Sequence, residues 1–597
     1  MGVGRSAWIF TAGAATLAAA GPTRAQLAPG TLVAPPTREE INRVPTATEP
    51  TPPSRLTISG GIEHAPCPLD APRFQSITVP LSDVVFDGLQ EADPATLRPA
   101  FEPYLGKTVP LSAICEIRDA AATILRRQGY LAAIQVPPQK IEGGIVHLNV
   151  LMAKLVAIHV RGDTGHAEAL LAAYLERLKN GRPFNEHEAE RSLLLARDLP
   201  GYDVRLVLRP AGTVPGEVVG DITVSRIPMD IDVNIQNFGS HSVGRWSGLV
   251  RAELNDLIGI GDRAFIGAYN TADIHEQTVL QGGYEVRPGI SGLTLASRFT
   301  YAWTHPEIGN GDPLKARTLV GTVEASVPVI RRQAETIRAV GGLDIVNQKL
   351  SFAGLPLTED KLRVLYARAD FDLLDPASIG STRGYSSNEP MWRATGSIEF
   401  RKGISAFGAS DDCGPAPLYL RCAAAPSLSR FDGKPQAALI RTNMSFELRP
   451  SSRFAVVVSP RAQYAFDPLL SYEQISAGNY TVGRGYDPGA LVGDSGVGVQ
   501  GEVRVGKLTP SGPDKLTFQP FAFFDASWTW IKNAPAGAGG SQRLYSTGGG
   551  ARFAFGDRAR LDLVAAVPLR RTPLQSERGD MRFLVSFTTR LLPWRPL

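Results

Sequence analysis

The alternation of apolar and polar residues changes character once along the chain. Between Phe74 and Val224, apolar residues recur at helical spacing in some stretches and alternate in others. From Met229 onward the helical period is absent and period-two alternation dominates. Leu293 to Trp303 shows it well, since its odd positions are mostly apolar and end in aromatics: Leu293, Leu295, Phe299, Tyr301 and Trp303. The pattern predicts an α+β region followed by an all-β region.

The all-β region has the pattern of strands that face lipid on one side and water on the other. Residues 440–448 and 583–587 alternate like 293–303, with arginines or glutamates on one face and aromatics at the rim of the other. A soluble sandwich also alternates, but this placement of charge favours an outer-membrane barrel. Residues 229–597 suit about 16 antiparallel strands, within a range of roughly 14 to 18, and closure satisfies every backbone group in lipid.

The α+β region divides into two similar modules, residues 73–153 and 154–228. The elements expected in the first are strand Phe74–Val79, helix Pro94–Tyr104, a helix from the N-cap Ser112 to Gly129-Tyr130, and strands Ala132–Val136 and Ile145–Met152. Those expected in the second are strand Val156–Val160, helices Ala167–Leu178 and Glu186–Leu199, and strands Val204–Leu208 and Ile222–Val224. The open sheet edges of such modules can pair with an extended partner, although purely structural domains have the same pattern.

The N-terminus reads as an export signal. The apolar run Ser6 to Ala20 follows a basic start and precedes a small-x-small site at Thr23-Arg24-Ala25, so residues 1–25 are expected to be a signal peptide. Residues 26–72 are rich in proline and threonine and predict a periplasmic linker, with a possible short helix around Arg38 to Arg43.

Net charge and cysteine content further limit the binding partners and bound groups that the chain can be expected to have. The formal net charge is +4 and charged residues make up 20% of the chain, so no nucleic acid partner is expected. The four cysteines of an exported chain should pair, and their positions suggest Cys67 with Cys115 and Cys413 with Cys422. No Cys-x-x-Cys or His-x-x-x-His spacing occurs, so no metal site is expected.

One loop-like segment carries a specific signal. Arg484 stands between Gly483 and Gly485, before Tyr486, so the backbone can turn tightly and project the guanidinium into a confined space. Such a group needs an acidic acceptor. Pro520 to Asp525, a strand-like apolar run that includes Phe523, delivers a single carboxylate at its end.

These residues resemble the two-partner secretion transporters, the hemolysin activation/secretion group of outer-membrane proteins with periplasmic POTRA domains. Val482 to Tyr486 matches the Val-Arg-Gly-Tyr motif of their sixth loop with one glycine inserted, and Phe523 to Asp525 matches the partner Phe-x-Asp strand. Gly129-Tyr130, Val136 to Gln139 and Asn237 to Ser240 resemble other family elements. The family's N-terminal plug helix is poorly marked, and the chain ends without a terminal aromatic.

The resemblance implies a mixed fold, with two α+β POTRA-like modules followed by a transmembrane barrel whose loop, residues 478–497, turns inward. Arg484 and Asp525 would anchor that loop in the lumen, and the client would bind somewhere within residues 73–228. The implied partners are a secreted adhesin- or hemolysin-like exoprotein and outer-membrane lipid. The protein would act as a monomer in the outer membrane of a Gram-negative bacterium, with its modules in the periplasm.

Other classes fit less well. A barrel-assembly insertase is the alternative, disfavoured by the count of two modules, and a passive porin is disfavoured by the loop motif. Gly493 to Gly496 resembles the nucleophile turn of a serine protease, but no histidine stands in the required context, so neither enzymatic activity nor a cofactor is expected.

Overall fold

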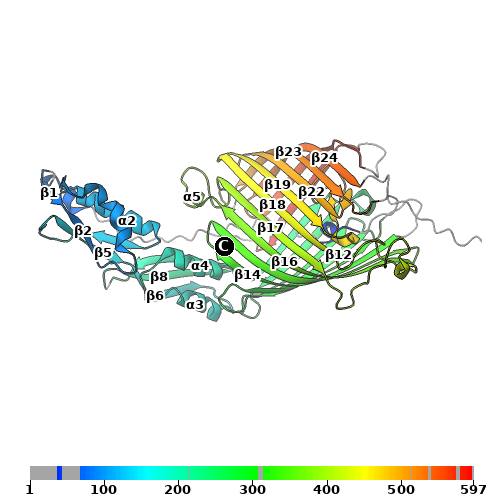
Figure 1. The fold of residues 1–597 in the computed structure, drawn as a ribbon, viewed down its shortest axis with the longest axis horizontal. Coiled ribbons are helices and arrows are strands. Elements are labelled where there is room, and N and C mark those ends of the chain that lie inside the picture. The colour runs from blue at the N-terminus through cyan, green and yellow to red at the C-terminus, as the bar shows by residue number, and fades with distance from the viewer. Residues whose placement is uncertain are drawn as a thin grey trace, which may run out of the picture.

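The fold is that of a computed structural model, which describes residues 36–42, 67–74, 76–179, 181–212, 214–306, 314–512, 514–534, 540–572 and 579–593. The expected signal peptide, residues 1–25, lies outside this part of the chain, as does most of the linker. Two small modules lie end to end and lead into one large barrel (Figure 1). Among the described residues, no helix is both long and apolar enough to cross a membrane.

The first module is an α+β sandwich held by one apolar cluster. Its three-stranded sheet has the order β2-β5-β4, with β2 parallel and β4 antiparallel to β5, and helix α2 packs on it. A separate two-stranded sheet pairs β1 with β3. The elements are β1 Thr78–Leu81, β2 Asp83–Asp87, η3 Pro94–Ala100, η4 Glu102–Tyr104, β3 Lys107–Pro110, α2 Ala113–Arg127, β4 Ala132–Gln135 and β5 Ile145–Met152.

Two local expectations for this module were wrong. The predicted strand at Phe74–Val79 begins only at Thr78, and Phe74 ends a 3-10 turn, η2 Pro72–Phe74. The predicted helix Pro94–Tyr104 is two 3-10 helices, because internal prolines such as Pro99 lack the N–H that an α-helix needs. Ser112 is the N-cap of α2, as expected, although its side chain makes no cap bond because its own backbone is already helical.

The second module repeats the plan with a better defined sheet. The strand order is β6-β8-β7, β6 runs parallel to β8, and α3 and α4 cover one face around the buried Tyr174 and Leu193. Its elements lie close to the predicted ones: β6 Lys154–Gly162, α3 Glu168–Glu176, α4 Glu186–Arg197, β7 Tyr202–Pro210 and β8 Glu217–Arg226. Asn185 caps α4 through bonds from the backbone N–H groups of His187 and Glu188.

The remainder of the chain closes into an antiparallel barrel of sixteen strands, as predicted. Strand β9 pairs with both β10 and the last strand β26, so no edge is left open. The strands are β9 Met229–Gln236, β10 Ser247–Asn255, β11 Arg263–Thr271, β12 Gln277–Val286, β13 Thr294–Thr304, β14 Leu314–Arg331, β15 Glu335–Phe352, β16 Leu355–Leu374, β17 Trp392–Gly403, β18 Ala438–Ser451, β19 Phe454–Ala465, β22 Ser495–Val505, β23 Leu516–Trp530, β24 Ser541–Phe555, β25 Ala559–Pro568 and β26 Arg582–Leu592.

Hydrogen bonds and an ion pair attach the second module to the periplasmic turns of the barrel. Asp198, just after α4, accepts both guanidinium arms of Arg331 at 2.7 Å, and Glu190 accepts the backbone N–H of Gln333 at 2.6 Å. The Tyr174 hydroxyl donates to the Gly289 carbonyl of another turn. These contacts fix the module against one side of the barrel mouth.

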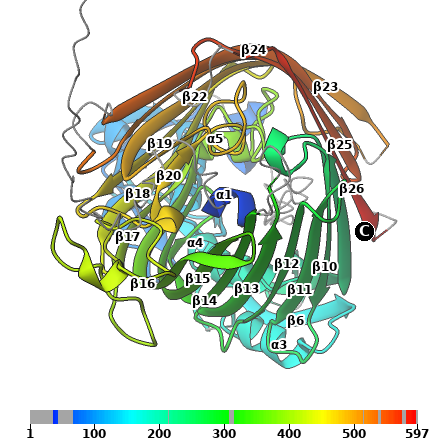
Figure 2. The same ribbon diagram turned by 90° about the vertical axis from the view of Figure 1, so that its right-hand side faces the viewer.

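The short helix expected in the linker exists but lies inside the barrel. Helix α1, Arg38–Ile41, stands within the ring of strands (Figure 2), and the carbonyl of Ile41 accepts a bond from Gln281 on β12. The described part of the linker, residues 36–42, is therefore lumenal rather than periplasmic. A helix this short has no apolar period to reveal its packing, and its partners come from distant strands.

Candidate functional site in the barrel lumen

The connection between β19 and β22, residues 466–494, folds back into the lumen. It contains a 3-10 turn, η7 Ser471–Glu473, and a small hairpin of β20 Ile475–Ala477 with β21 Leu491–Gly493. Its tip, residues 478–490, holds the Arg484 motif. The loop thus begins well before the expected residue 478, and residues 495–497 already belong to β22.

Arg484 and Asp525 meet as expected. Arg484 Nη2 donates to Asp525 Oδ1 at 2.7 Å, and its Nε and backbone N–H donate to Oδ2 at 3.1 and 2.9 Å. The Asp525 side chain is fully buried and also accepts the Ser546 hydroxyl. A buried, two-armed bond between a guanidinium and a carboxylate fixes the loop tip to β23.

Two further residues complete this anchor. Phe523, named by the motif, lies beneath the guanidinium with its ring centre 3.7 Å from the Arg484 Cζ. Glu502 on β22 accepts Arg484 Nη1 and is also held by Arg504 and Arg552. Sequence reasoning missed Glu502, although its place opposite Phe523 in the β22–β23 register is where a second lumenal carboxylate should lie.

The two glycines and the tyrosine of the motif have distinct tasks. Gly483 has a φ of +124°, and a Cβ there would lie 2.7 Å from Leu544 Cδ1. A Cβ on Gly485 would meet the backbone nitrogen of Pro568 at 2.8 Å, so the loop can approach the wall only without a side chain. The Tyr486 hydroxyl lies 2.6 Å from the Arg570 carbonyl and ties the tip to the β25–β26 connection.

Helix α1 is the second object in the lumen. Thr37 and Glu40 form a reciprocal capping box, which stabilises so short a helix. Its Ile41 is fully buried in a small apolar cluster on the wall formed by β10 to β13, with Leu249, Tyr269, Val279 and Ala302. On the opposite side Glu39 pairs with Arg461 on β19 and accepts the Ser476 hydroxyl at 2.9 Å. The helix therefore spans the lumen from wall to inward loop.

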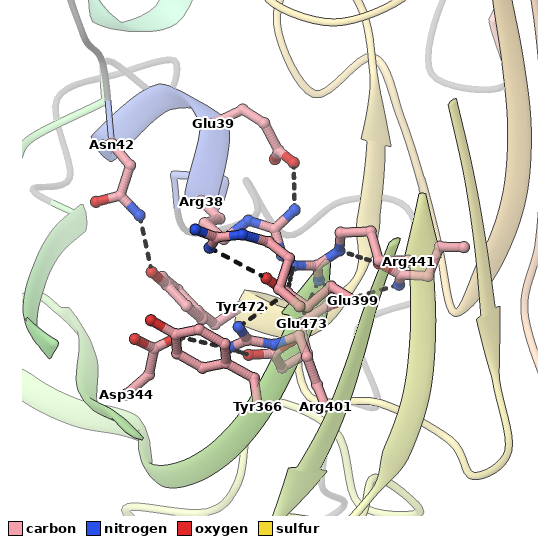
Figure 3. A network of polar contacts seen from close by, with 12 residues as sticks. Arg38, Glu39, Asn42, Asp344, Tyr366, Glu399, Arg401, Arg441, Tyr472 and Glu473 are labelled. Atoms are coloured by element: carbon pink, nitrogen blue, oxygen red, sulfur yellow. Dashed lines mark hydrogen bonds and ion pairs between the residues drawn. The ribbon is translucent and has the colours of Figure 1, made fainter. Parts of the chain in front are cut away.

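A buried charge network links this helix, the loop and the barrel wall (Figure 3). Arg401 on β17 donates to both oxygens of Glu473 in η7, at 3.0 and 2.8 Å, and also reaches Asp344 on β15. Arg441 on β18 donates to the same Glu473 at 3.2 Å. Asn42, directly after α1, donates to the Tyr472 hydroxyl.

The network keeps its loop carboxylate ionised. Burial alone would raise the pKa of Glu473, but the guanidinium groups of Arg401, Arg441 and Arg38 outweigh it and lower the pKa to about 2. For Glu39, burial likewise opposes ionisation, while Arg38 and Arg461 lower its pKa well below the usual range. Glu39 of the helix and Glu473 of the loop are thus both held as ions, while Ile41 anchors the other side of the helix by apolar packing.

Beside α1 lies a polar chamber. A cavity of about 510 Å³ opens between Asn42 and the wall formed by β10 to β17. Its lining alternates basic and acidic side chains, among them Arg251, Glu253, Arg298, Glu324 and Arg368. The surface therefore presents charge of both signs beside apolar groups such as Phe265 and Phe299.

Both expected disulfides are formed. Cys67 bonds Cys115 and so ties the end of the linker to α2, while Cys413 bonds Cys422 in the β17–β18 connection. The part of the chain that the structure describes holds no cluster of three metal-ligating side chains. Asp494 of the protease-like turn is fully buried and accepts Arg430, which gives it a structural task.

Two periplasmic α+β modules joined to a closed barrel whose lumen holds an anchored loop define the class of POTRA-bearing outer-membrane barrels. Residues 376–553 match the family model of the haemolysin secretion/activation proteins ShlB/FhaC/HecB, and residues 79–152 match the ShlB-type POTRA domain. In these two matched regions, and in this order, the chain is similar to the two-partner secretion transporters.

Individual relatives agree with this assignment. The heme/hemopexin transporter protein HuxB of Haemophilus influenzae is 26% identical over 244 residues, 39% of this chain and 43% of HuxB. The outer membrane transporter CdiB of Escherichia coli is 21% identical over 253 residues, 42% of each chain. The matched stretch thus spans less than half the length of these curated relatives.

The fold resembles solved structures over a longer range. CdiB from Escherichia coli aligns with a TM-score of 0.67 at 18% identity, covering 89% of this chain and 94% of that chain. CdiB from Acinetobacter baumannii aligns with a TM-score of 0.58 at 17% identity, over 92% of this chain and 94% of that one. At such identities the likeness concerns the fold alone.

Proposed function

We propose that this protein captures an unfolded exoprotein in the periplasm through its two modules and passes it through the barrel to the cell surface. The observation that carries the proposal is the kind of contact that holds the inward loop and helix α1 in the lumen. The loop tip and α1 are held mainly by charged and hydrogen-bonded contacts, whose partners water can replace when the contents move. A passive porin has no need for such removable contents.

Client capture is assigned to the sheets of residues 73–228. In the first module β2 and β4 are edge strands, and in the second β6 and β7 are. An unfolded chain offers backbone donors and acceptors that pair with an open edge irrespective of most side chains. The client is expected to be a large adhesin- or hemolysin-like exoprotein.

Transport needs no catalytic residue or cofactor. The periplasm supplies no nucleotide, and folding of the exoprotein outside the cell makes its passage one-way. Arg484, Asp525 and Glu502 act as an anchor, and the protein works as a monomer, because one barrel encloses the whole path. Nucleic acid has no part in it.

Deletion of residues 73–228 tests the proposal. The full chain and the deletion variant would each be co-expressed with a candidate exoprotein, and the exoprotein would be measured in the medium. The variant should reach the outer membrane with heat-modifiable migration yet secrete nothing. Normal secretion by the barrel alone would overturn the receptor role, whereas a general loss of other outer-membrane barrels would favour the insertase alternative.

A further inference from the structure

The outer wall of the barrel carries one residue whose burial is unexpected. On β16 the residues Leu365, Ala367 and Ala369 are exposed and face outward, while Leu362, Val364 and Tyr366 are buried and face the lumen. By this alternation Arg363 faces outward, one step closer to the extracellular rim than Leu365. Yet only 6% of Arg363 is exposed, so something covers it from outside.

The cover is the start of the β17–β18 connection, residues 404–410, here called the rim segment. The N–H of Ile404 donates to the Arg363 carbonyl at 2.8 Å, and Arg363 Nε donates to the Phe407 carbonyl at 2.9 Å. Further along, the N–H of Ser410 donates to the Lys361 carbonyl at 2.9 Å. The rim segment is thus fastened along the outer face of β16. Figure 2 shows part of the β17–β18 connection, in yellow-green, outside the ring of strands.

The rim segment presents a strained and exposed aromatic ring. Phe407 has a φ of +50°, a conformation that residues with a Cβ seldom adopt, and 71% of it is exposed. Exposure of a large apolar side chain to water disfavours this arrangement unless a partner covers the ring. Arg363 donates three hydrogen bonds to β15 and β16 and one to the Phe407 carbonyl, so its side chain ties the rim segment to the barrel wall.

The surroundings define the chemistry of that partner. Toward the membrane centre the outward neighbours are apolar, with Leu365 and Phe400 about half exposed. Lys402 on β17 is paired with Leu365, and nearer the rim Lys361 and Lys349 share the single carboxylate of Glu359, which leaves this cluster with a net positive charge. An aromatic ring between an apolar band and a row of lysines matches the boundary between acyl chains and phosphate groups of a lipid.

We propose that the rim segment is a lipid-docking site, in which Phe407 inserts among outer-leaflet acyl chains and Lys361 and Lys402 bind the phosphate groups of the same lipids. The rim segment thus extends the lipid-facing surface of the barrel toward the extracellular rim, beyond Leu365 and Phe400. The site would fix the height of the rim segment on the outer wall, while the later residues of the same connection, such as Arg430, contact the lumenal loop.

Photocrosslinking in intact cells tests this site. The photoreactive analogue p-benzoylphenylalanine would replace Phe407 in the full chain, and the mass of the irradiated peptide would be measured. Leu365, on the lipid-facing wall, is the positive control. Leu355 is the matched negative control, since it is also 71% exposed but stands ten residues along β16 from Leu365, about 33 Å toward the rim at 3.3 Å per residue.

The expected result is a lipid adduct at 407 and 365 and none at 355. A polypeptide adduct at 407 would assign the segment to a protein partner and overturn the proposal, as would an unmodified peptide at 407 while 365 is modified. In a second measurement, Lys361→Gln with Lys402→Gln should reduce the lipid adduct at 407 severalfold while leaving that at 365 unchanged. Equal adduct yields would remove the lysines from the site.

Discussion

Glu39 of helix α1 forms an ion pair with Arg461 on β19 inside the barrel, although 422 residues separate them in the chain. The pair is mostly buried, with side chains 15% and 12% exposed. It is one of the contacts that hold the N-terminal helix across the lumen. Movement of the helix out of the lumen would have to break this ion pair or move β19 with the helix.

Glu39→Gln should therefore loosen the helix. The amide keeps the shape but loses the charge that binds Arg461, so the open probability of single channels in planar bilayers should rise about tenfold, equivalent to about 1.4 kcal/mol. Asp467→Asn, which removes a more exposed ion pair with Lys434 at the rim, is the matched control and should change little. Equal open probability of the unchanged protein and both variants would show that this ion pair does not hold the helix.

Lowering the pH should also loosen helix α1, because it protonates Glu473 and Glu39. Their pKa values are lowered in the folded protein, to about 2 for Glu473, so their contribution is present above the ordinary value near 4.5 and is lost as the pH falls from there toward 2. Channel records should be stable from pH 5 to 8 and show more frequent opening as the pH falls below about 4.5. A record unchanged down to pH 2.5 would contradict this linkage.

Arg484→Ala should abolish secretion without removing the barrel from the membrane. Breaking a buried ion pair costs about 3–5 kcal/mol, because the partner charge of Asp525 is left uncompensated. Arg484→Lys keeps the charge but cannot make the two-armed bond, and should secrete at an intermediate level. Exoprotein in the medium, at equal barrel content, is the measurement.

The Asp525 partner gives a coupling test. Asp525→Ala should resemble Arg484→Ala, and the double variant should be no worse than the worse single one, because both remove the same bond. Strictly additive losses would mean that the two residues act separately. The third partner, Glu502, should show weaker coupling, since Arg504 and Arg552 also hold it.

Loss of the Cys67–Cys115 bond should destabilise the first module. The bond closes 48 residues, and its removal by Cys67→Ser with Cys115→Ser should lower the free energy of unfolding of that module by about 2–4 kcal/mol. Protease sensitivity of residues 76–152 in the full chain measures it. Cys413→Ser with Cys422→Ser, in the distant barrel connection, is the control and should leave this region resistant.

The joint between the second module and the barrel depends on Asp198. Asp198→Ala removes the two-armed bond to Arg331, so spin-label distances between the module and the barrel should broaden. Asp203→Ala breaks an ion pair with Arg205 inside the module and should leave those distances sharp. Identical distributions for the two variants would show that other contacts hold the joint.

The sequence alone determined the features that depend on local pattern. Alternation with period two located strands such as β13 and β26 and gave a closed barrel of the right size, because each strand records which of its faces meets lipid. The pairing of Arg484 with Asp525 was also expected, since a guanidinium between two glycines needs a nearby carboxylate. The two disulfides were expected because the four cysteines of an exported chain can pair in few ways.

Only the tertiary structure decided which distant groups share the lumen. Glu502 joined the anchor because strand register placed it opposite Phe523, and α1 entered the barrel because Ile41 and Glu39 found partners on opposite walls. The burial of Arg363 likewise depends on where the rim segment runs. Such contacts join residues that are far apart in the chain, and their energies depend on closure of the barrel, which no local pattern contains.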